Sequence, residues 1–455
     1  MRRRIEKYLS NWLTSKNRKP MIMRGARQVG KTWIVRQLVK ENRLHLLEFN
    51  FERLPEQVSL FKSNDPKQIL LNIEASNNST IYPEKSLLFL DEIQAAPELI
   101  AKLRWFAEEM PELRIIAAGS LLEFVLKEHT FSMPVGRIEY CHLEPLSFFE
   151  FLEAQGKINL LEFMYQININ TEIPELIHNQ LKYLFKEYLI IGGMPEAVQS
   201  WVNEKSLSSI HKIHQNLIAT FRDDFHKYAH KSSITNLNEI LIAIPRLLGK
   251  KFVFSHVKKD VQASSLKNAL NILARARVCH VVHATAGNTI PLAAEIKQNF
   301  FKVLFLDVGL ASAVLKLNLI NVQSFDTLTF AHQGGLSEQI AGQLIRTLDD
   351  FYIEPELFYW LREQKGTQSE IDFLIQYGPH IIPVEVKSGT TGSLKSLHLF
   401  MQLKKLPTAV RINMDFPSVT KVETKLHDGC QVGYTLLSIP FYLIEQLPKL
   451  IKEMG

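Results

Sequence analysis

The sequence is poor in cysteine and contains no long apolar run. Its three cysteines are spaced too widely for a disulfide framework or a zinc motif. The apolar stretch from Val303 to Leu315 is shorter than the roughly 20 residues of a membrane helix, and Asp307 interrupts it. The basic start of the chain is not followed by the apolar segment of a signal peptide. We therefore expect a cytoplasmic protein without a membrane segment.

Neither sign of charge dominates the composition. The 53 Lys and Arg residues exceed the 47 Asp and Glu residues by only 6 charges. This balance permits contact with nucleic acid but does not require it. The 455 residues, of which 46% are hydrophobic, exceed one ordinary domain, so we expect about two to four.

Repeats and low-complexity tracts are also lacking, and the patterning divides the chain into four regions. Residues 20–145 alternate short apolar runs with helical patterns, which predicts an α/β domain with a parallel sheet. Helical spacing then dominates, interrupted by a turn at 192–195. The third region combines helical patterns with two β-like runs, which fits a winged-helix unit. The fourth region has a second α/β pattern. The predicted domains are a nucleotide-binding core at 1–150, a helical lid at 151–231, a winged-helix-like unit at 232–325 and a second α/β domain at 326–455.

Residues 25–32 form an unbroken G-x-x-x-x-G-K-T phosphate-binding loop between a short apolar run and a helical pattern. In such a P-loop, backbone N–H groups and the helix N-terminus surround the phosphates. The Lys31 ammonium can reach the β- and γ-phosphates, and the Thr32 hydroxyl can hold Mg²⁺. We therefore predict that ATP is bound by Gly25, Ala26, Arg27, Gln28, Val29, Gly30, Lys31 and Thr32.

An acidic pair follows a second apolar run. Leu87 to Leu90 predict a buried strand that would deliver Asp91 and Glu92 beside the P-loop. Asp91 would coordinate Mg²⁺ through water, and Glu92 would polarise the attacking water. The alternative is a buried strand that ends in an acidic helix cap.

Three further polar residues are candidates for the nucleotide site. Ser120 follows the predicted strand 114–118 and could contact the γ-phosphate or the lytic water. Arg137 could stabilise transition-state charge, including that on a neighbouring subunit's nucleotide, or could be a surface salt-bridge arginine. Asn50, after the strand 46–49, could hydrogen-bond Glu92 and hold it idle.

The C-terminal region carries the D-x(n)-E-x-K arrangement of metal-dependent nucleases. Asp372 and Glu385 would bind Mg²⁺, and Lys387 would lie on the same strand face as Glu385 and orient water or neutralise phosphate. Glu338 supplies an additional carboxylate. The pattern alone arises by chance about twice in a chain of this length. Here apolar neighbours predict that these charges emerge from buried strands, so the carboxylates should converge on a common ligand.

Two weaker signals allow opposite interpretations. His226 and His230 are one helical turn apart and could bind a metal, but a solvated helix face explains them better. Basic residues around the winged-helix region could track DNA phosphates or only solubilise the surface. They are Arg246, Lys250, Lys251, Lys258, Lys259, Lys267, Arg275 and Arg277.

The order of motifs along nearly the whole chain resembles that of a known family. The motifs are R-G-x4-G-K-T from Arg24, D-E-I-Q from Asp91, G-S from Gly119, G-R from Gly136, P-L-S-F from Pro145, G-G-M-P-E from Gly192 and F-L-D-V-G-L from Phe305. They resemble a prokaryotic group of AAA+ ATPases with a C-terminal domain of restriction-endonuclease-like, PD-(D/E)xK type. The resemblance implies an AAA+ core, a helical lid and a winged helix. The turn at 192–196 departs from many AAA+ proteins because it lacks the arginine that senses the γ-phosphate.

Two functional hypotheses follow. In the first, an ATP-hydrolysing, Mg²⁺-dependent AAA+ protein controls a nuclease-like domain directed at DNA, and a homo-oligomer would let Arg137 act between subunits. In the second, ATP drives a regulatory switch whose C-terminal domain holds a protein or DNA partner without cleaving it. A helicase-like motor is a third, less favoured interpretation.

Overall fold

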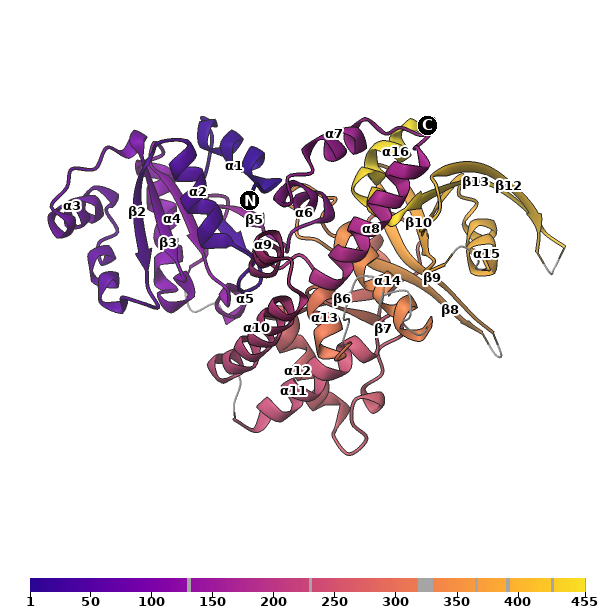
Figure 1. The fold of residues 1–455 in the computed structure, drawn as a ribbon. Helices are drawn as coiled ribbons and strands as arrows, with labels where there is room; N and C mark the ends of the chain where they lie inside the picture. Colours follow the sequence, from indigo (N-terminus) through magenta and orange to yellow (C-terminus); the bar gives the residue numbers. More distant parts are fainter. Residues whose placement is uncertain are drawn as a thin grey trace.

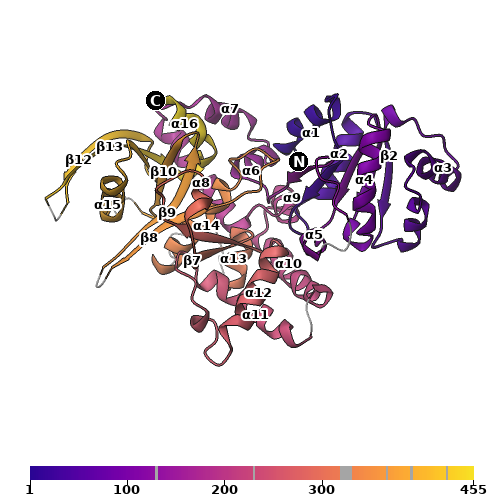
Figure 2. The same cartoon turned by 180° about the vertical axis from the view of Figure 1, so that it is seen from behind.

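The computed structural model describes residues 1–128, 132–228, 231–317, 330–364, 367–389, 393–426 and 429–454. Figure 1 shows an α/β unit at one end of the molecule, a second sheet at the other end, and helices between them. The view from behind in Figure 2 has the same arrangement. The chain thus builds two sheets that are separated by helical layers.

Within the described residues, five parallel strands form the N-terminal sheet in the order β2-β3-β4-β1-β5. Every residue of the apolar strand β3 is buried, because β3 lies between β2 and β4 and the sheet is covered on both faces. Each strand predicted for this region is present. The strands are β1 Met21–Arg24, β2 His45–Asn50, β3 Ser86–Asp91, β4 Arg114–Ala118 and β5 Glu139–His142.

Helices cover both faces of this sheet. Side chains of α1 and α2 join one hydrophobic cluster, and side chains of α3 and α4 join another on the opposite face. The helices are α1 Ile5–Thr14, α2 Lys31–Glu41, α3 Pro66–Asn77, α4 Glu98–Glu109 and α5 Leu122–Glu128.

The predicted lid region is helical. Its first helix begins with a capping box, in which Ser147 and Glu150 exchange side chain–backbone hydrogen bonds. Gly192 ends α8 with φ +75°, and Pro195 begins α9. The helices are α6 Phe148–Ala154, α7 Ile158–Gln166, α8 Glu175–Ile191, α9 Pro195–Glu204 and α10 Leu207–Tyr228.

The second sheet is larger and mixed. In the described part of the chain its strand order is β12-β13-β11-β10-β9-β8-β6-β7. Its strands are β6 Cys279–Thr285, β7 Ile296–Phe305, β8 Phe358–Gln364, β9 Thr367–Tyr377, β10 His380–Val386, β11 Thr408–Asn413, β12 Ser418–Lys425 and β13 Gln431–Pro440. The accompanying helices are α11 Lys231–Arg246, α12 Ala263–Arg275, α13 Val308–Val314, α14 Phe330–Ile345, α15 Lys395–Lys404 and α16 Leu447–Glu453.

The hairpin β6–β7 belongs to this same sheet. β6 pairs in parallel with β8, so the sheet continues across the boundary expected at 325/326. The hairpin that the sequence assigns to a winged-helix-like unit is therefore built into the C-terminal α/β layer. Residues 318–329, which contain that boundary, lie outside the described residues.

One hydrophobic cluster connects the two ends of the molecule. It extends from Ile5 in α1, through the lid helices, to Ile451 in α16. A separate cluster packs α15 on the other face of the second sheet. The described helices include none that is long and apolar enough to cross a membrane.

Candidate functional site

The P-loop lies between β1 and α2, at the carboxyl edge of the first sheet. Gly30 ends the loop with φ +97°, a left-handed conformation that favours glycine, and α2 begins at the next residue. Gly25 lies so close to the carbonyl oxygen of Leu143 that an added Cβ would overlap it. Both motif glycines are therefore required by the backbone, and the loop leads into the positive end of the α2 dipole.

Lys31 is buried, and its side chain folds back onto this loop. Its Nζ donates hydrogen bonds to the carbonyl oxygens of Gly25 at 3.0 Å and Ala26 at 2.8 Å. Burial lowers the pKa of Lys31 to about 8, although Glu92 and Asp91 favour the charged form. The ammonium group is thus mostly charged at neutral pH and can exchange carbonyl oxygens for phosphate oxygens.

Asp91 ends β3 and binds side chains from two other elements. Its Oδ2 accepts hydrogen bonds from Thr32 Oγ1 and from Asn50 Nδ2, each at 3.1 Å. Burial and the adjacent Glu92 raise the pKa of Asp91. The expected contact between Asn50 and Glu92 is replaced by this bond to Asp91, because the β2–β3 register places Asn50 opposite Asp91.

Glu92 lies one residue beyond β3, next to Ser120. Its Oε2 accepts hydrogen bonds from Gln94 Nε2 at 2.5 Å and from the Ser120 backbone and hydroxyl at 3.4 Å. β3 and β4 are neighbours, so their carboxyl ends bring these residues together. Sequence reasoning missed Gln94 as a partner of Glu92, although it follows the acidic pair by two residues.

Arg137 lies apart from these residues. It forms an ion pair with Glu108 of α4 at 2.8 Å, and its side chain is 52% exposed. Arg137 precedes β5, and Glu139 pairs with Met21 at the start of β1, so Arg137 lies at the amino edge of the sheet. The structure therefore places it in the surface salt bridge that was the alternative interpretation, away from its own P-loop.

The lid helix α10 contacts the P-loop directly. Arg27 Nη1 lies 2.6 Å from both carboxylate oxygens of Asp224. Lys227, one turn along α10, also pairs with Glu52 beyond β2. The sequence analysis did not select Asp224 and so missed its contact with Arg27.

The predicted metal pair His226 and His230 falls partly outside the described residues, and another histidine of α10 is structural. His214 is buried, and its Nε2 lies 2.9 Å from the carbonyl oxygen of Ile191, which fits a structural role. Burial lowers the pKa of His214. His226 is exposed, and the side chain of His230 lies outside the described residues.

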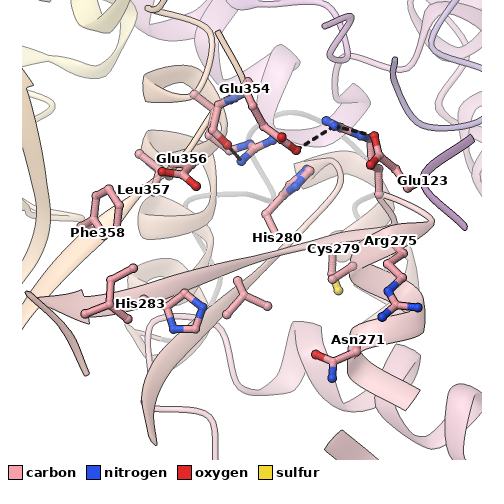
Figure 3. A pocket seen from close by; sticks show the side chains of 16 residues that line it. Glu123, Asn271, Arg275, Cys279, His280, His283, Glu354, Glu356, Leu357 and Phe358 are labelled. Carbon is pink, nitrogen blue, oxygen red and sulfur yellow. Dashed lines mark hydrogen bonds and ion pairs between the residues drawn. The ribbon is translucent and has the colours of Figure 1, made fainter. Parts of the chain in front are cut away.

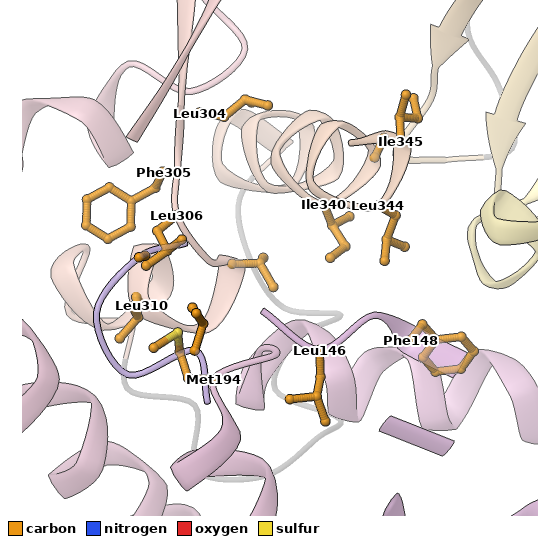
Figure 4. Packing of buried hydrophobic residues seen from close by; sticks show 14 of the residues in the cluster. Leu146, Phe148, Met194, Leu304, Phe305, Leu306, Leu310, Ile340, Leu344 and Ile345 are labelled. Atoms are coloured by element: carbon orange, nitrogen blue, oxygen red, sulfur yellow. The ribbon is translucent and has the colours of Figure 1, made fainter. Parts of the chain in front are cut away.

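Asp307, of the F-L-D-V-G-L motif, lies where the G-G-M-P-E and P-L-S-F motifs also meet. Its carboxylate caps α13 and also accepts the Gly193 N–H at 2.7 Å and the Gln343 amide at 3.0 Å. Leu146 donates its backbone N–H to the Gly193 carbonyl at 2.7 Å. Figure 4 shows the apolar layer around this junction, where Leu146 and Met194 face side chains of β7, α13 and α14.

The second candidate site lies where β7, α14, β9 and β10 meet. Asp372 accepts the Val386 N–H at 2.7 Å, and Lys387 Nζ lies 2.7 Å from Glu385 Oε1. Glu338, Glu370 and Asp372 offer oxygen atoms within 4.8 Å of one another. The structure thus brings the predicted residues together and adds Glu370, which the sequence analysis did not select although it shares a strand face with Asp372.

Lys302 of β7 is the other residue that sequence reasoning missed at this site. Its Nζ lies 2.8 Å from Glu338 Oε2 and 3.7 Å from Asp372 Oδ1, and it also pairs with Glu370. Burial opposes the charge of Lys302, but these carboxylates raise its pKa well above its ordinary value. Burial raises the pKa of Glu338 and of Glu385 to about 8.

A cavity of about 440 Å³ lies between the first sheet and the second. Arg277 crosses its wall and binds Glu123 at 3.1 Å and Glu354 at 3.0 Å, as the dashed lines in Figure 3 show. Burial would raise the pKa of Glu144, but Arg346 and its cationic neighbours lower it to about 2. This ionic network connects β5 with the second sheet.

The basic residues of the winged-helix region separate into three kinds: those in surface ion pairs, one that is buried, and those that are exposed. Lys251 pairs with Glu363 at 2.9 Å, and Lys258 pairs with Glu239 at 3.0 Å. Arg277 is buried in the network between the sheets, so it is not available to DNA phosphates. Arg246, Lys250 and Arg275 are exposed.

Family comparisons match three consecutive parts of the chain. Residues 17–152 match the AAA domain, residues 182–320 a domain of unknown function (DUF8612), and residues 333–423 a domain of unknown function (DUF4143). The parallel sheet, the P-loop and Asp91 all lie in the first part. Residues 17–152 therefore form an AAA-type P-loop domain, a nucleotide-binding fold.

Two solved structures from Aeropyrum pernix are similar to this chain. The ORC2 protein in ADPNP–ADP complexes is 13% identical, with coverage of 71% of this chain and 92% of that chain and a TM-score of 0.32. The ORC1 protein in complex with DNA is 11% identical, with coverage of 69% and 90% and a TM-score of 0.29. No curated protein matches the sequence.

Proposed function

We propose that this chain is an ATP-hydrolysing AAA+ protein whose nucleotide state controls a C-terminal nuclease-like domain directed at DNA. The observation that carries the ATPase proposal is the convergence of Lys31, Thr32 and Asp91 at one edge of the parallel sheet. Glu92 and Ser120 lie beside them. An ammonium group, a hydroxyl and two carboxylates are the groups that P-loop hydrolysis uses.

Each residue has a defined role in this proposal. Lys31 neutralises the β- and γ-phosphates, while Thr32 and Asp91 hold Mg²⁺. Glu92 polarises the attacking water once its carboxylate exchanges the Gln94 amide for that water. Ser120 contacts the γ-phosphate or the water. Arg137 would serve a neighbouring subunit in a homo-oligomer.

A second cavity beside the P-loop supports binding of a nucleotide base. Its volume is about 260 Å³, and it adjoins Gly30, Trp33 of α2 and Pro195 of α9. Arg3 fixes its wall by donating to the Val29 carbonyl oxygen at 3.0 Å. Because the P-loop and the lid both line this cavity, a base placed there would hold the lid against the core.

Three contacts could carry the nucleotide state to the second sheet. Arg27 connects the P-loop with α10, Gly193 connects the lid with Asp307, and Arg277 connects β5 and α5 with the cavity between the sheets. The first two would change if the lid or the P-loop moved, and the third would change if α5 moved relative to the second sheet. These contacts support nucleotide control of the C-terminal region.

The donor set of the C-terminal cluster fits a divalent cation. Carboxylate oxygens from α14 and β9 lie close together there, and such oxygens are the hard ligands that Mg²⁺ prefers. Among the residues that the structure describes, Glu385 Oε2 is buried without a hydrogen-bond partner, which is costly unless it binds a cation. We propose that Glu338, Asp372 and Glu385 would hold the ion, which would activate water and neutralise phosphate. Lys387 would orient the attacking water or neutralise the phosphate.

One observation favours the alternative of a switch that does not cleave. Lys302 and Lys387 already form ion pairs with the carboxylates of the cluster. In this second proposal the C-terminal domain holds a DNA or protein partner, and its charges only stabilise the fold.

ATP turnover with and without single- and double-stranded DNA, followed on gels for cutting, separates these proposals. We expect Mg²⁺-dependent turnover that falls at least about 100-fold in Lys31→Ala, because the phosphates lose their ammonium partner. Lys40→Ala, which changes an exposed lysine of the same helix, should retain turnover.

The gels decide between the two C-terminal functions. Cutting that requires Mg²⁺ and disappears in Asp372→Asn, while ATP turnover persists, would support the nuclease. ATP turnover without any cutting would support the switch. A wild-type chain that neither binds nor hydrolyses ATP would overturn both.

A further inference from the structure

Lys302 occupies the centre of the C-terminal carboxylate cluster. Only 2% of the residue is exposed, and its ammonium pairs with Glu338, Glu370 and Asp372. Its Nζ also lies 5.3 Å from the centre of the Tyr359 ring. A buried ammonium with three acidic partners is in the position that a bound cation would take.

The cluster has more acidic than basic groups. Four carboxylates face two ammonium groups, those of Lys302 and Lys387. The side chain of Glu385 is only 8% exposed, and its Oε2 has no hydrogen-bond partner in the described part of the chain. Unpartnered carboxylate oxygen therefore remains beside Lys302, so the site can accept additional positive charge.

Lys302 also comes from a different part of the chain than its partners. It lies on β7, inside the segment 182–320, whereas its three acidic partners lie inside the segment 333–423. β7 pairs with β6, whose His280 lines the cavity between the two sheets. A shift of the β6–β7 hairpin would thus move the ammonium relative to the carboxylates.

We infer that Lys302 is a built-in counter-cation that competes with a divalent cation for the carboxylates of Glu338 and Asp372. This inference rests on the proposed metal site. The ammonium stabilises the cluster when no metal is bound, and it weakens metal binding because both cations need the same oxygens. Withdrawal of Lys302 therefore opens the site.

The test compares Lys302→Met with the wild-type full-length chain, with Mn²⁺ as the probe. In EDTA, Lys302→Met should unfold at a lower temperature than the wild type, and Mn²⁺ should restore much of the loss. Calorimetry should show Mn²⁺ binding at least about tenfold tighter in Lys302→Met. Lys251→Met, which breaks a more exposed ion pair with Glu363 on the same layer, should match the wild type in Mn²⁺ affinity.

Two other outcomes of the Mn²⁺ titration would contradict the inference. Equal Mn²⁺ affinity in both chains would overturn the competition and leave the metal site standing. Absence of Mn²⁺ binding in both chains would overturn the inference and the metal site, while the ATPase proposal would stand.

A second variant tests the inference if Lys302→Met folds poorly. Lys302→Met/Glu370→Gln removes one carboxylate together with the ammonium, so in EDTA it should unfold at a higher temperature than Lys302→Met. An equal or lower unfolding temperature would overturn the inference, as would a Lys302→Met chain that fails to accumulate even with Mn²⁺.

Discussion

The environment of Lys31 is unusual for a lysine in two respects. It is buried, and the ammonium is held by backbone carbonyl oxygens of its own loop. Phosphate oxygens favour its charged form more strongly than carbonyl oxygens do. ATP binding should therefore be coupled to the protonation of Lys31.

This coupling predicts a specific pH dependence. The pKa of Lys31 is about 8 in the free chain, and bound triphosphate should raise it. Below pH 8 the ammonium is already charged, so ATP affinity should change little there. As the pH rises from 8 to 10, affinity should fall by up to about tenfold per unit. Calorimetric titration checks this, and Lys31→Arg, which stays charged, should flatten the dependence.

Single site residues could be predicted from the sequence where they belong to a motif or directly follow an apolar run. Asp91, Glu92 and Ser120 follow apolar runs that must be neighbouring strands, so their meeting could be predicted. Lys302 could not be predicted, because a lone lysine is usually exposed, and this one is buried with the last five residues of β7 only through long-range pairing. Its partners are too distant in sequence for any local pattern.

The turn between α8 and α9 shows how an element boundary can depend on tertiary contact. Gly192 has φ +75° and ψ −170°, a region that is essentially restricted to glycine. A Cβ at this position would lie 2.7 Å from Asp307 Cγ and would overlap a carboxylate oxygen. The turn is therefore constrained both by its backbone and by the residue that caps α13.

A pair of substitutions separates these two constraints. Gly192→Ala should destabilise the chain by about 3–5 kcal/mol, because it adds overlap with Asp307 to backbone strain. Gly156 has a similar φ of +70°, but a Cβ added there would meet no described atom within 4 Å. Gly156→Ala should therefore cost only about 1–2 kcal/mol. Thermal unfolding of both variants checks the difference, and equal losses would show that Asp307 contributes nothing.

Element types were more predictable than the pairing of elements. Apolar runs located the strands of the first sheet, since parallel strands buried on both faces are continuously apolar. β12 was not predicted, because its residues are mostly exposed and carry no apolar alternation. The partnership of β6 with β8 depends on residues about 75 positions apart, which local patterning does not encode.

The C-terminal part of the molecule is held together by a sheet that crosses a family boundary. β6 and β7 lie in the 182–320 segment, but they form one edge of the sheet that contains β8 to β13. Leu304 of β7 also packs against Gly342 of α14. The C-terminal segment therefore depends on the hairpin that precedes it.

Fragments of the chain should reveal this dependence. Fragment 326–455 exposes the edge of β8 and leaves the acidic cluster without Lys302, so it should be largely unfolded or aggregated. Fragment 231–455 retains the hairpin and should have more strand signal and a cooperative transition. Circular dichroism and thermal melts check this, and a well-folded 326–455 fragment would contradict it.

The shared hairpin also constrains how such chains can diversify. If the C-terminal part were exchanged between related proteins at a junction near residue 326, a chimera would combine an ammonium from one parent with carboxylates from another. Exchange at a junction upstream of β6 would instead transfer the β6–β7 hairpin, Lys302 and its acidic partners together. Recombination should therefore be tolerated before residue 279 and selected against in the interval between β7 and α14.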